Sequence, residues 1–95
     1  MWYVYFLRCA DSSLYAGITN DLKRRLEQHN SGRGGAYTRS RKPVRLIYQE
    51  QCNDKSSALR REVQLKRWKK EKKEALIAGD FEKLQELGHR HGKEL

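Results

Sequence analysis

The chain has few of the residues that would suggest a secreted, disulfide-built or membrane protein. Its two cysteines, Cys9 and Cys52, are too few for a disulfide framework and lack the CxxC or Cys/His spacing of a metal site. We therefore expect two reduced thiols that pack as small apolar residues. No apolar run approaches the roughly 20 residues that a membrane-spanning helix needs, and the N-terminal segment lacks the layout of a signal peptide. These absences predict a cytoplasmic protein without membrane association.

Acidic residues are also scarce relative to basic ones. The 95 residues include 21 Lys and Arg against 12 Asp and Glu, which gives a net charge of +9. Residues 23–45 hold eight basic side chains against Glu27 alone, and residues 55–74 hold nine against three. Such a charge favours a polyanionic partner. The length, together with the absence of a repeat or linker, predicts one domain over residues 1–95.

Proline is nearly absent, and Pro43 is the only one. The hydrophobic pattern predicts strands at residues 2–9, 14–18 and 44–52, and helices at residues 21–30, 55–68, 70–78 and 81–87. Asn53 and Asp54 are expected to cap the helix over 55–68, and Gly79 and Asp80 to separate the last two. The order β-β-α-β-α-α predicts an α+β fold: a small three-stranded antiparallel sheet flanked by helices.

The hairpin between the first two strands decides which tyrosines share a face. If residues 11–13 form a three-residue loop, Tyr15 lies opposite Cys9, and Tyr5 lies on the same face as Tyr15. A loop with an even number of residues would place the two tyrosines on opposite faces.

Two predicted helices carry polar residues on the side that should pack on the sheet. The spacing i, i+3, i+4, i+7 from Leu22 selects Arg25, Leu26 and His29. Taken alone, Arg25 could instead be a surface residue whose aliphatic stem packs on the protein while its charge stays in solvent. His29 could instead be a histidine at the edge of the core whose nitrogens are hydrogen-bonded within the protein. Together they could grip a phosphate and hydrogen-bond a nucleophile or a phenol.

Glu62 occupies a comparable position in the helix over 55–68. Ala58, Leu59, Val63 and Leu65 are expected to mark its inward side, so Glu62 should point toward the sheet. One interpretation is an internal ion pair with Arg25 or a nearby lysine. The other is a site for one hard cation such as Mg²⁺, held by one carboxylate, waters and a substrate phosphate.

The Gly- and Arg-rich segment over residues 31–42 is predicted to be a loop that binds nucleic acid, mobile when empty. It combines cations with an aromatic ring, as phosphate contacts and base stacking require; its candidates are Arg33, Tyr37, Thr38, Arg39, Arg41 and Lys42. An ordinary solvated basic loop is the alternative. Most lysines after residue 65 should be solvated, although some, such as Lys66, could reach a duplex. Nothing resembles a base-reading helix, which favours weakly specific or structure-dependent binding.

The motifs Tyr3-Val4-Tyr5 and Tyr15-Ala16-Gly17, followed by Arg25 and His29 and then by Glu62, resemble the GIY-YIG superfamily of endonucleases over roughly residues 2–70, with residues 70–95 as a helical tail. The start YVYFLRCADSSLYAGITNDL, the AYTRSRxP loop and the ALRREVQLK stretch look like small, stand-alone bacterial members with no assigned role.

The resemblance implies a monomeric DNA endonuclease with one active site and one divalent ion, Mg²⁺ or Mn²⁺, and no small-molecule cofactor. Glu62 would bind the metal, and Arg25 would neutralise the scissile phosphate. Tyr5 or Tyr15 would act as base or orient the attacking water, with His29 supporting a phenol. Gly17 would let the chain approach the phosphate.

The chain also departs from the family pattern. Ile18 stands where some members have lysine, and no asparagine follows Glu62, where many active members carry one about a dozen residues downstream. A catalytically silent DNA- or RNA-binding module on the same fold is therefore the alternative. A third possibility is an adaptor whose basic faces dock an acidic protein.

Overall fold

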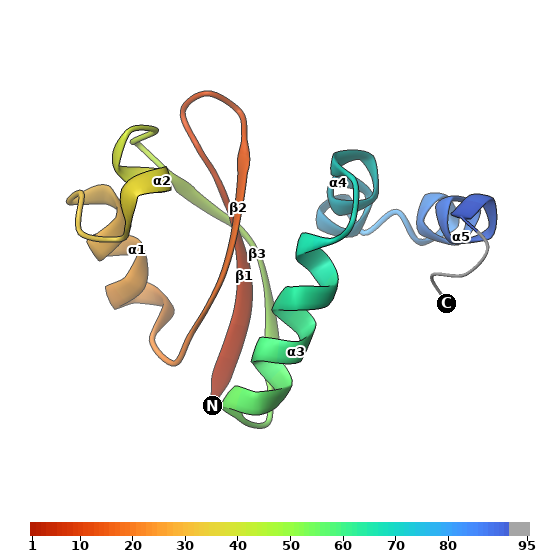
Figure 1. The fold of residues 1–95 in the computed structure, drawn as a ribbon, viewed down its shortest axis with the longest axis horizontal. Coiled ribbons are helices and arrows are strands. Elements are labelled where there is room, and N and C mark those ends of the chain that lie inside the picture. Colours follow the sequence, from red (N-terminus) through yellow and green to blue (C-terminus); the bar gives the residue numbers. More distant parts are fainter. Residues whose placement is uncertain (92–95) are drawn as a thin grey trace.

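The computed structural model describes residues 1–91, and the side chains of residues 1–87. Figure 1 shows a sheet with helices on both sides. The elements in chain order are β1 (Trp2–Arg8), β2 (Leu14–Thr19), α1 (Leu22–Asn30), α2 (Ala36–Arg39), β3 (Arg45–Cys52), α3 (Lys55–Lys66), α4 (Lys70–Ala78) and α5 (Phe81–His91). The predicted α+β fold is confirmed. Within the described part of the chain, every helix is too short or too polar to cross a membrane.

The sheet is antiparallel with the strand order β2-β1-β3, so the N-terminal strand is central. Its alternation sends Val4 and Phe6 to one face and Tyr5 and Leu7 to the other, and all four are at most 2% exposed. The prediction of a first strand buried on both faces is therefore confirmed.

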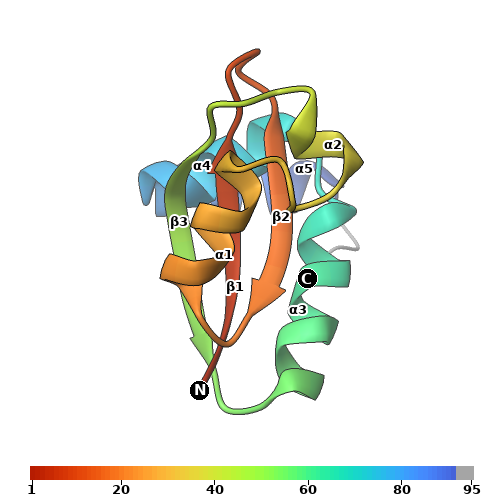
Figure 2. The same cartoon turned by 90° about the vertical axis from the view of Figure 1, so that its left-hand side faces the viewer.

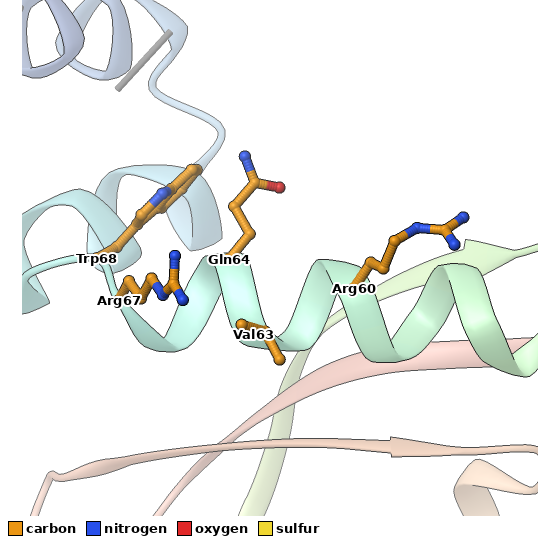
Figure 3. A pocket seen from close by; sticks show the side chains of 5 residues that line it. All are labelled: Arg60, Val63, Gln64, Arg67 and Trp68. Atoms are coloured by element: carbon orange, nitrogen blue, oxygen red, sulfur yellow. The ribbon is translucent and has the colours of Figure 1, made fainter. Parts of the chain in front are cut away.

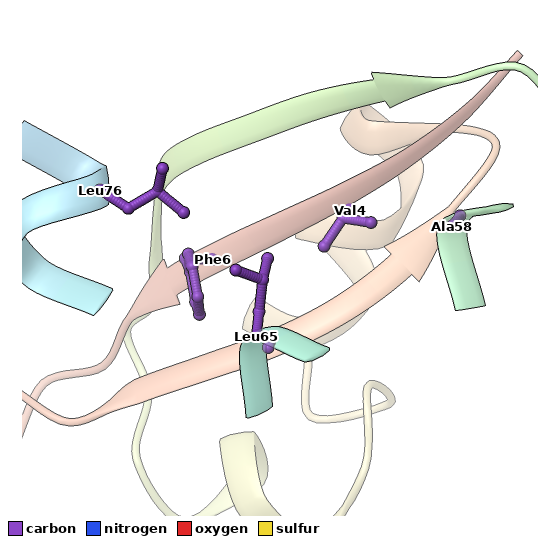
Figure 4. Close-up of a cluster of buried hydrophobic side chains, with 6 residues drawn as sticks. Val4, Phe6, Ala58, Leu65 and Leu76 are labelled. Carbon is purple, nitrogen blue, oxygen red and sulfur yellow. The ribbon is translucent and has the colours of Figure 1, made fainter. Parts of the chain in front are cut away.

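Helices cover the two faces of the sheet unequally. Helix α1 lies on the face that carries Tyr5, whereas α3 and α4 pack on the opposite face (Figures 1 and 2). The opposite face holds the larger core, in which Phe6 of β1 meets Leu65 of α3 and Leu76 of α4 (Figure 4). Arg8 and Glu74 add a bidentate ion pair, with N–O distances of 2.5 and 2.6 Å, that ties α4 to the end of β1.

The hairpin register differs from the predicted one by two residues. Tyr15 lies opposite Leu7 rather than Cys9, and Tyr5 lies opposite Gly17. The connection is longer than three residues because the strands end at Arg8 and Leu14. A shift of two residues restores each side chain to its original face, so Tyr5 and Tyr15 do share the α1 face of the sheet.

The buried face of helix α3 is narrower than the sequence predicts. Ala58 and Leu65 are fully buried, whereas Leu59 and Val63 are 43% and 48% exposed. The prediction that Leu59 and Val63 point inward is therefore wrong. A helix lying on a small sheet buries only the stripe i, i+3, i+4, i+7, and from Ala58 that stripe contains Glu62 but neither of these two.

The other element boundaries agree closely with the prediction. Helix α3 ends at Lys66 instead of residue 68, and α5 extends to His91. Asp54 caps α3 by accepting a hydrogen bond from the backbone N–H of Ser57. Both cysteines are free and packed against the core. The predicted loop over residues 31–42 contains a one-turn helix, α2, which contributes to the candidate active site.

Candidate active site

A buried chain of three polar side chains lies between the sheet and α1. The Tyr5 hydroxyl is 3.0 Å from Nε2 of His29, and Nδ1 of His29 is 2.8 Å from the Thr38 hydroxyl. His29 and Thr38 are fully buried and Tyr5 is 2% exposed. Each hydrogen-bonding group in the chain therefore has a protein partner, as buried polar groups require.

Burial shifts the pKa values of Tyr5 and His29 in this hydrogen-bonded group of side chains. It raises the pKa of Tyr5 to about 12, although the nearby guanidinium of Arg25 opposes the shift. It also lowers the pKa of His29 to about 4, and the positive charge of Arg25 acts in the same direction. Neutral imidazole has one donor and one acceptor nitrogen. The hydrogen bonds must consequently run in one direction, either from Tyr5 toward Thr38 or from Thr38 toward Tyr5.

Local structure at both ends of α1 holds His29 in place. Asp21 begins the helix by accepting a hydrogen bond from the Arg24 backbone N–H at 3.1 Å. At the other end, the side-chain amide of Asn30 pairs with both backbone groups of Val44, at 2.8 and 3.1 Å. This double hydrogen bond closes the loop over residues 31–43 against the start of β3.

The loop over residues 31–43 supplies Gly34 and Thr38 to the site, and the sequence did not indicate their roles there. Gly34 is buried directly against His29, and a Cβ atom at this position would overlap the imidazole ring. Thr38 on α2 was expected to contact nucleic acid. Its side chain is instead turned inward onto His29, so it cannot reach a ligand on the surface. The expectation for Thr38 is wrong, because a buried imidazole nitrogen needs a partner and α2 provides one.

Glycine is required at position 17 because the Tyr5 side chain lies against its backbone. A Cβ atom on Gly17 would lie 2.5 Å from the Tyr5 hydroxyl oxygen and 2.7 Å from Cζ. The Tyr5 ring therefore lies across the Gly17 backbone on the neighbouring strand. Contact between Gly17 and a substrate phosphate stays a prediction.

This packing predicts a defined stability effect for Gly17→Ala. Overpacking of this kind costs roughly 1–3 kcal/mol, so we expect the free energy of unfolding in urea to fall by about 2 kcal/mol. In a Tyr5→Leu background the ring that causes the clash is absent, so most of this loss should disappear. An equal loss in both backgrounds would show that Gly17 is needed for another reason.

Arg25 and Glu62 bring opposite charges to the Tyr5 phenol. The Arg25 guanidinium donates to Oε1 of Gln28 at 3.0 Å and to the Gly34 carbonyl at 3.3 Å, which holds it beside the site. Glu62 lies on α3, which packs along β1 and β2. Its charge contributes a small upward shift to the pKa of Tyr5.

The Glu62 carboxylate is largely buried, with 16% of its side chain exposed. Its partner is Lys66, one turn along α3, at an N–O distance of 3.5 Å. The ion-pair interpretation therefore holds for a nearby lysine, not for Arg25. Lys66 is 53% exposed and can turn toward solvent, so contact with nucleic acid stays a prediction for this residue.

Aromatic rings connect the buried side chains of Tyr5, His29 and Thr38 to the protein surface. The Tyr15 ring centroid is 5.0 Å from that of His29, 6.5 Å from that of Tyr5 and 5.9 Å from that of Tyr37. Tyr37 is 39% exposed, and the Arg41 guanidinium stacks on it at 3.9 Å. An aromatic path thus leads from Tyr5 to the outer surface of α2.

The remaining loop cations differ in their freedom to bind a phosphate. Arg33, Arg39 and Lys42 are exposed. Arg41 instead pairs with Asp11 of the hairpin loop at 3.1 Å and donates to the Tyr37 carbonyl. Its charge is therefore partly compensated, so the three exposed cations are the stronger candidates for phosphate contacts.

The site offers one carboxylate to a metal ion. Among the residues that the structure describes, no group of three His, Cys, Asp or Glu side chains could hold an ion together. An all-protein cage is therefore absent from residues 1–91. Magnesium commonly binds through one or two carboxylates, several waters and substrate phosphates, and Glu62 fits that mode as a hard oxygen donor.

Comparison with known proteins agrees with this arrangement. The family model described as the GIY-YIG catalytic domain matches residues 1–75, which include Tyr5, Tyr15, Arg25, His29 and Glu62. This chain belongs to the GIY-YIG family. The match ends within α4, so the remainder of that helix and α5 lie outside the matched residues.

Relatives of this GIY-YIG protein are similarly small. It is 47% identical over 93 residues to a UPF0213 protein of Bacillus pumilus, covering 98% of this chain and 94% of the relative. It is 48% identical over 77 residues to UPF0213 protein DP2720 of Desulfotalea psychrophila, covering 80% of this chain and 70% of that protein. The solution NMR structure of the UPF0213 protein BH0048 from Bacillus halodurans matches with a TM-score of 0.54 and 43% identity, covering 82% of this chain and 84% of that one.

Proposed function

We propose that this GIY-YIG protein is a monomeric, divalent-metal-dependent endonuclease that hydrolyses a phosphodiester in one strand of branched, damaged or single-stranded DNA. The observation that supports this best is the buried hydrogen bond between the Tyr5 phenol and His29, with the Arg25 guanidinium held beside it by the Gly34 carbonyl. The charges of Arg25 and Glu62 both act on this phenol, in opposite directions. A structural tyrosine would not need a buried histidine, a guanidinium and a carboxylate around it. Charged groups that perturb a buried titratable side chain are typical of catalytic sites.

Glu62 would hold the metal, which when bound stabilises negative charge on the oxygen that leaves the phosphorus. For this to occur the carboxylate must exchange Lys66 for the ion. The exposure of Lys66 and the 3.5 Å separation make that exchange feasible. Mg²⁺ and Mn²⁺ both suit a carboxylate ligand.

Arg25 would bind the non-bridging oxygens of the scissile phosphate through its guanidinium. The Tyr5 or Tyr15 phenol would orient the attacking water by accepting a hydrogen bond or, as the phenolate that Arg25 and a bound cation favour, would take its proton as the water oxygen bonds to phosphorus. The bond from phosphorus to the 3′ oxygen then breaks, which leaves a 5′-phosphate and a 3′-hydroxyl. His29 would orient the Tyr5 hydroxyl, since its Nε2 lies 3.0 Å from that oxygen.

Arg25 provides the test, because the adjacent Arg24 is a matched control. Both residues lie on α1, but Arg24 is exposed and Arg25 is half-buried beside the site. Removing a preorganised group that stabilises transition-state charge typically costs about 10²–10³ in rate. We expect Arg25→Ala to lower nicking of supercoiled plasmid with Mn²⁺ by that factor, and Arg24→Ala to change it less than about threefold.

Equal losses in both variants would show that only the general positive charge matters, which would contradict the assigned role of Arg25. Affinity for DNA should be measured in EDTA for both variants, so that a lower rate is not confused with weaker binding.

The second candidate is a nucleic-acid-binding module without catalysis. It is favoured by the ion pair that already engages Glu62 and by the absence of an asparagine after it. This candidate predicts salt-sensitive binding that divalent ions do not change. Metal-dependent strand cleavage that is lost on changing Glu62 would exclude it.

A further inference from the structure

The outer surface of α3 carries a pocket that the active site does not use. Its volume is about 310 Å³, and its lining comes from one side of α3 and the residues that follow it: Arg60, Val63, Gln64, Arg67 and Trp68 (Figure 3). These positions are spaced i, i+3, i+4, i+7 and i+8. They therefore form one continuous stripe that faces away from the sheet.

The charge of the pocket suits an anion. Its lining contains two arginines and no acidic residue. Arg60 donates to the hydroxyls of Ser56 and Ser57, at 3.0 and 3.3 Å. Among the side chains of residues 1–87, neither Arg60 nor Arg67 forms an ion pair with a carboxylate. Hydrogen bonds from Ser57 lower the pKa of Asp54, and Arg60 lies close enough to that carboxyl for its charge to lower the pKa further. Two guanidinium groups outside direct ion pairs favour a phosphate, which each can bind through two N–H groups.

The remaining lining suits a planar, partly apolar group. Val63 is 48% exposed. Trp68 is half-buried and packs against the core, and Nζ of Lys72 and Cζ of Arg61 lie over its ring at 4.2 and 5.4 Å from the centroids, so a base can contact only the part of the ring that stays exposed. Gln64 accepts a hydrogen bond from Arg61 through its Oε1 at 2.8 Å. Among the described side chains, its amide nitrogen forms no hydrogen bond and can donate to a ligand. A nucleobase has both the flat face and the edge acceptors that these groups fit.

The pocket lies on the far side of α3 from the carboxylate of the active site. Successive residues of a helix are about 100° apart, so the five lining residues lie between about 100° and 160° around α3 from Glu62. A helix with its side chains is only about 10–12 Å across. Along the helix axis, Arg67 is about 7.5 Å from Glu62 at a rise of about 1.5 Å per residue. A DNA strand with its scissile phosphate at Glu62 can thus reach the pocket within a few nucleotides.

We propose that this pocket binds one unpaired nucleotide of the substrate strand. Arg60 and Arg67 hold its phosphate, the base lies against Trp68 and Val63, and Gln64 donates to the base edge. The inference rests on the proposed function, because it assumes a strand that passes Glu62. It also gives a reason for selecting unpaired or branched DNA, since a base within a duplex must first lose its pairing and stacking to turn into the pocket.

The test is binding of short single-stranded DNA in EDTA, which requires no turnover. The probes are fluorescein-labelled dT₆ and the same hexamer with abasic residues. Stacking of one base contributes about tenfold in affinity, so wild type should bind dT₆ several-fold to tenfold more tightly than the abasic probe. The Arg60→Ala/Arg67→Ala variant should lose that preference and bind dT₆ at least tenfold more weakly. The matched control is Arg24→Ala/Arg45→Ala, which removes the same charge from exposed positions elsewhere and should keep the preference.

Three outcomes would overturn the proposal. One is equal binding of dT₆ and the abasic probe by wild type. Another is an equal loss of affinity in both double variants. The third is competition by polyglutamate as strong as by dT₆, which would indicate a surface for acidic peptides. Urea unfolding checks that each variant is folded, and Trp68→Phe provides an independent variant that keeps an aromatic ring and should weaken only the preference for dT₆.

The two proposals can fail separately. If wild type cleaves no DNA but shows the base preference, the endonuclease proposal falls and the binding pocket stands. If wild type cleaves DNA, and the Arg60→Ala/Arg67→Ala variant binds and cleaves as wild type does, the pocket proposal alone is overturned.

Discussion

Replacing Glu62 with glutamine should abolish metal-dependent cleavage while leaving nucleic-acid binding intact. Glutamine keeps the size of the side chain but removes the charge that attracts a divalent ion. Among the residues that the structure describes, Glu62 is the one carboxylate whose charge acts on the phenol of Tyr5, so we expect no other described carboxylate to replace it. We expect a fall of about a thousandfold or more in the single-turnover cleavage rate. Affinity for DNA in EDTA should stay within about threefold of wild type, and should rise slightly because Lys66 is released from its ion pair.

The matched control is Glu82→Gln, which removes the same charge from an exposed position in α5. Its cleavage rate should equal that of wild type. If Glu62→Gln cleaved as fast as wild type, Glu62 would not be the metal ligand and the proposed chemistry would be wrong. Raising the Mn²⁺ concentration offers a further check, because partial recovery of cleavage would indicate weakened metal binding at the same site.

His29 should make the protein less stable as the pH falls below neutrality. Its pKa is near 6.5 in an unfolded chain and about 4 in the folded protein, because burial and Arg25 disfavour the imidazolium. Between these values the unfolded state binds more protons, so the free energy of unfolding decreases as the pH falls. A difference of this size corresponds to about 3 kcal/mol lost between pH 7 and pH 4.

The measurement is urea unfolding at several pH values for wild type and His29→Gln. Glutamine does not titrate, so the variant should be less stable at pH 7 but much less sensitive to pH between 6.5 and 4.5. Burial raises the pKa of Glu50, but hydrogen bonds from Arg61 and Tyr48 outweigh it, so the pKa is lowered. The hydrogen bond from Arg8 lowers the pKa of Glu74. Their contributions are lost at lower pH and should be common to both proteins. Parallel curves for the two proteins would contradict a buried, neutral His29.

The sequence predicts the elements that follow hydrophobic periodicity. The strands, the cap at Asp54 and the break at Gly79 all agree with the structure, because local chain chemistry determines them. The inward face of α1 could also be predicted from spacing alone. The exposure of Leu59 and Val63 could not be predicted, since whether a helical position is buried depends on how wide the sheet beneath it is.

The loop between α1 and β3 shows what a single sequence does not reveal. Glycine and arginine in residues 31–42 indicate a mobile, basic loop, and Thr38 within it resembles a surface residue. In the structure Gly34 is buried against His29, and Thr38 completes its hydrogen bonds. These contacts join residues that are five and nine positions apart in sequence, and neither follows a helical or strand period. The double hydrogen bond between Asn30 and Val44 was missed for the same reason.

The central claim is that Tyr5, Arg25, His29 and Glu62 form a site that hydrolyses DNA. Its most direct test is incubation of purified wild-type protein with end-labelled single-stranded, flapped, nicked and four-way-junction DNA in Mg²⁺, Mn²⁺ or EDTA. The account predicts cleavage of one strand in at least one of these substrates with a divalent ion and none in EDTA, with 5′-phosphate and 3′-hydroxyl ends. If all four substrates remain intact with both metals while salt-sensitive binding persists, the site does not hydrolyse them and the claim is contradicted.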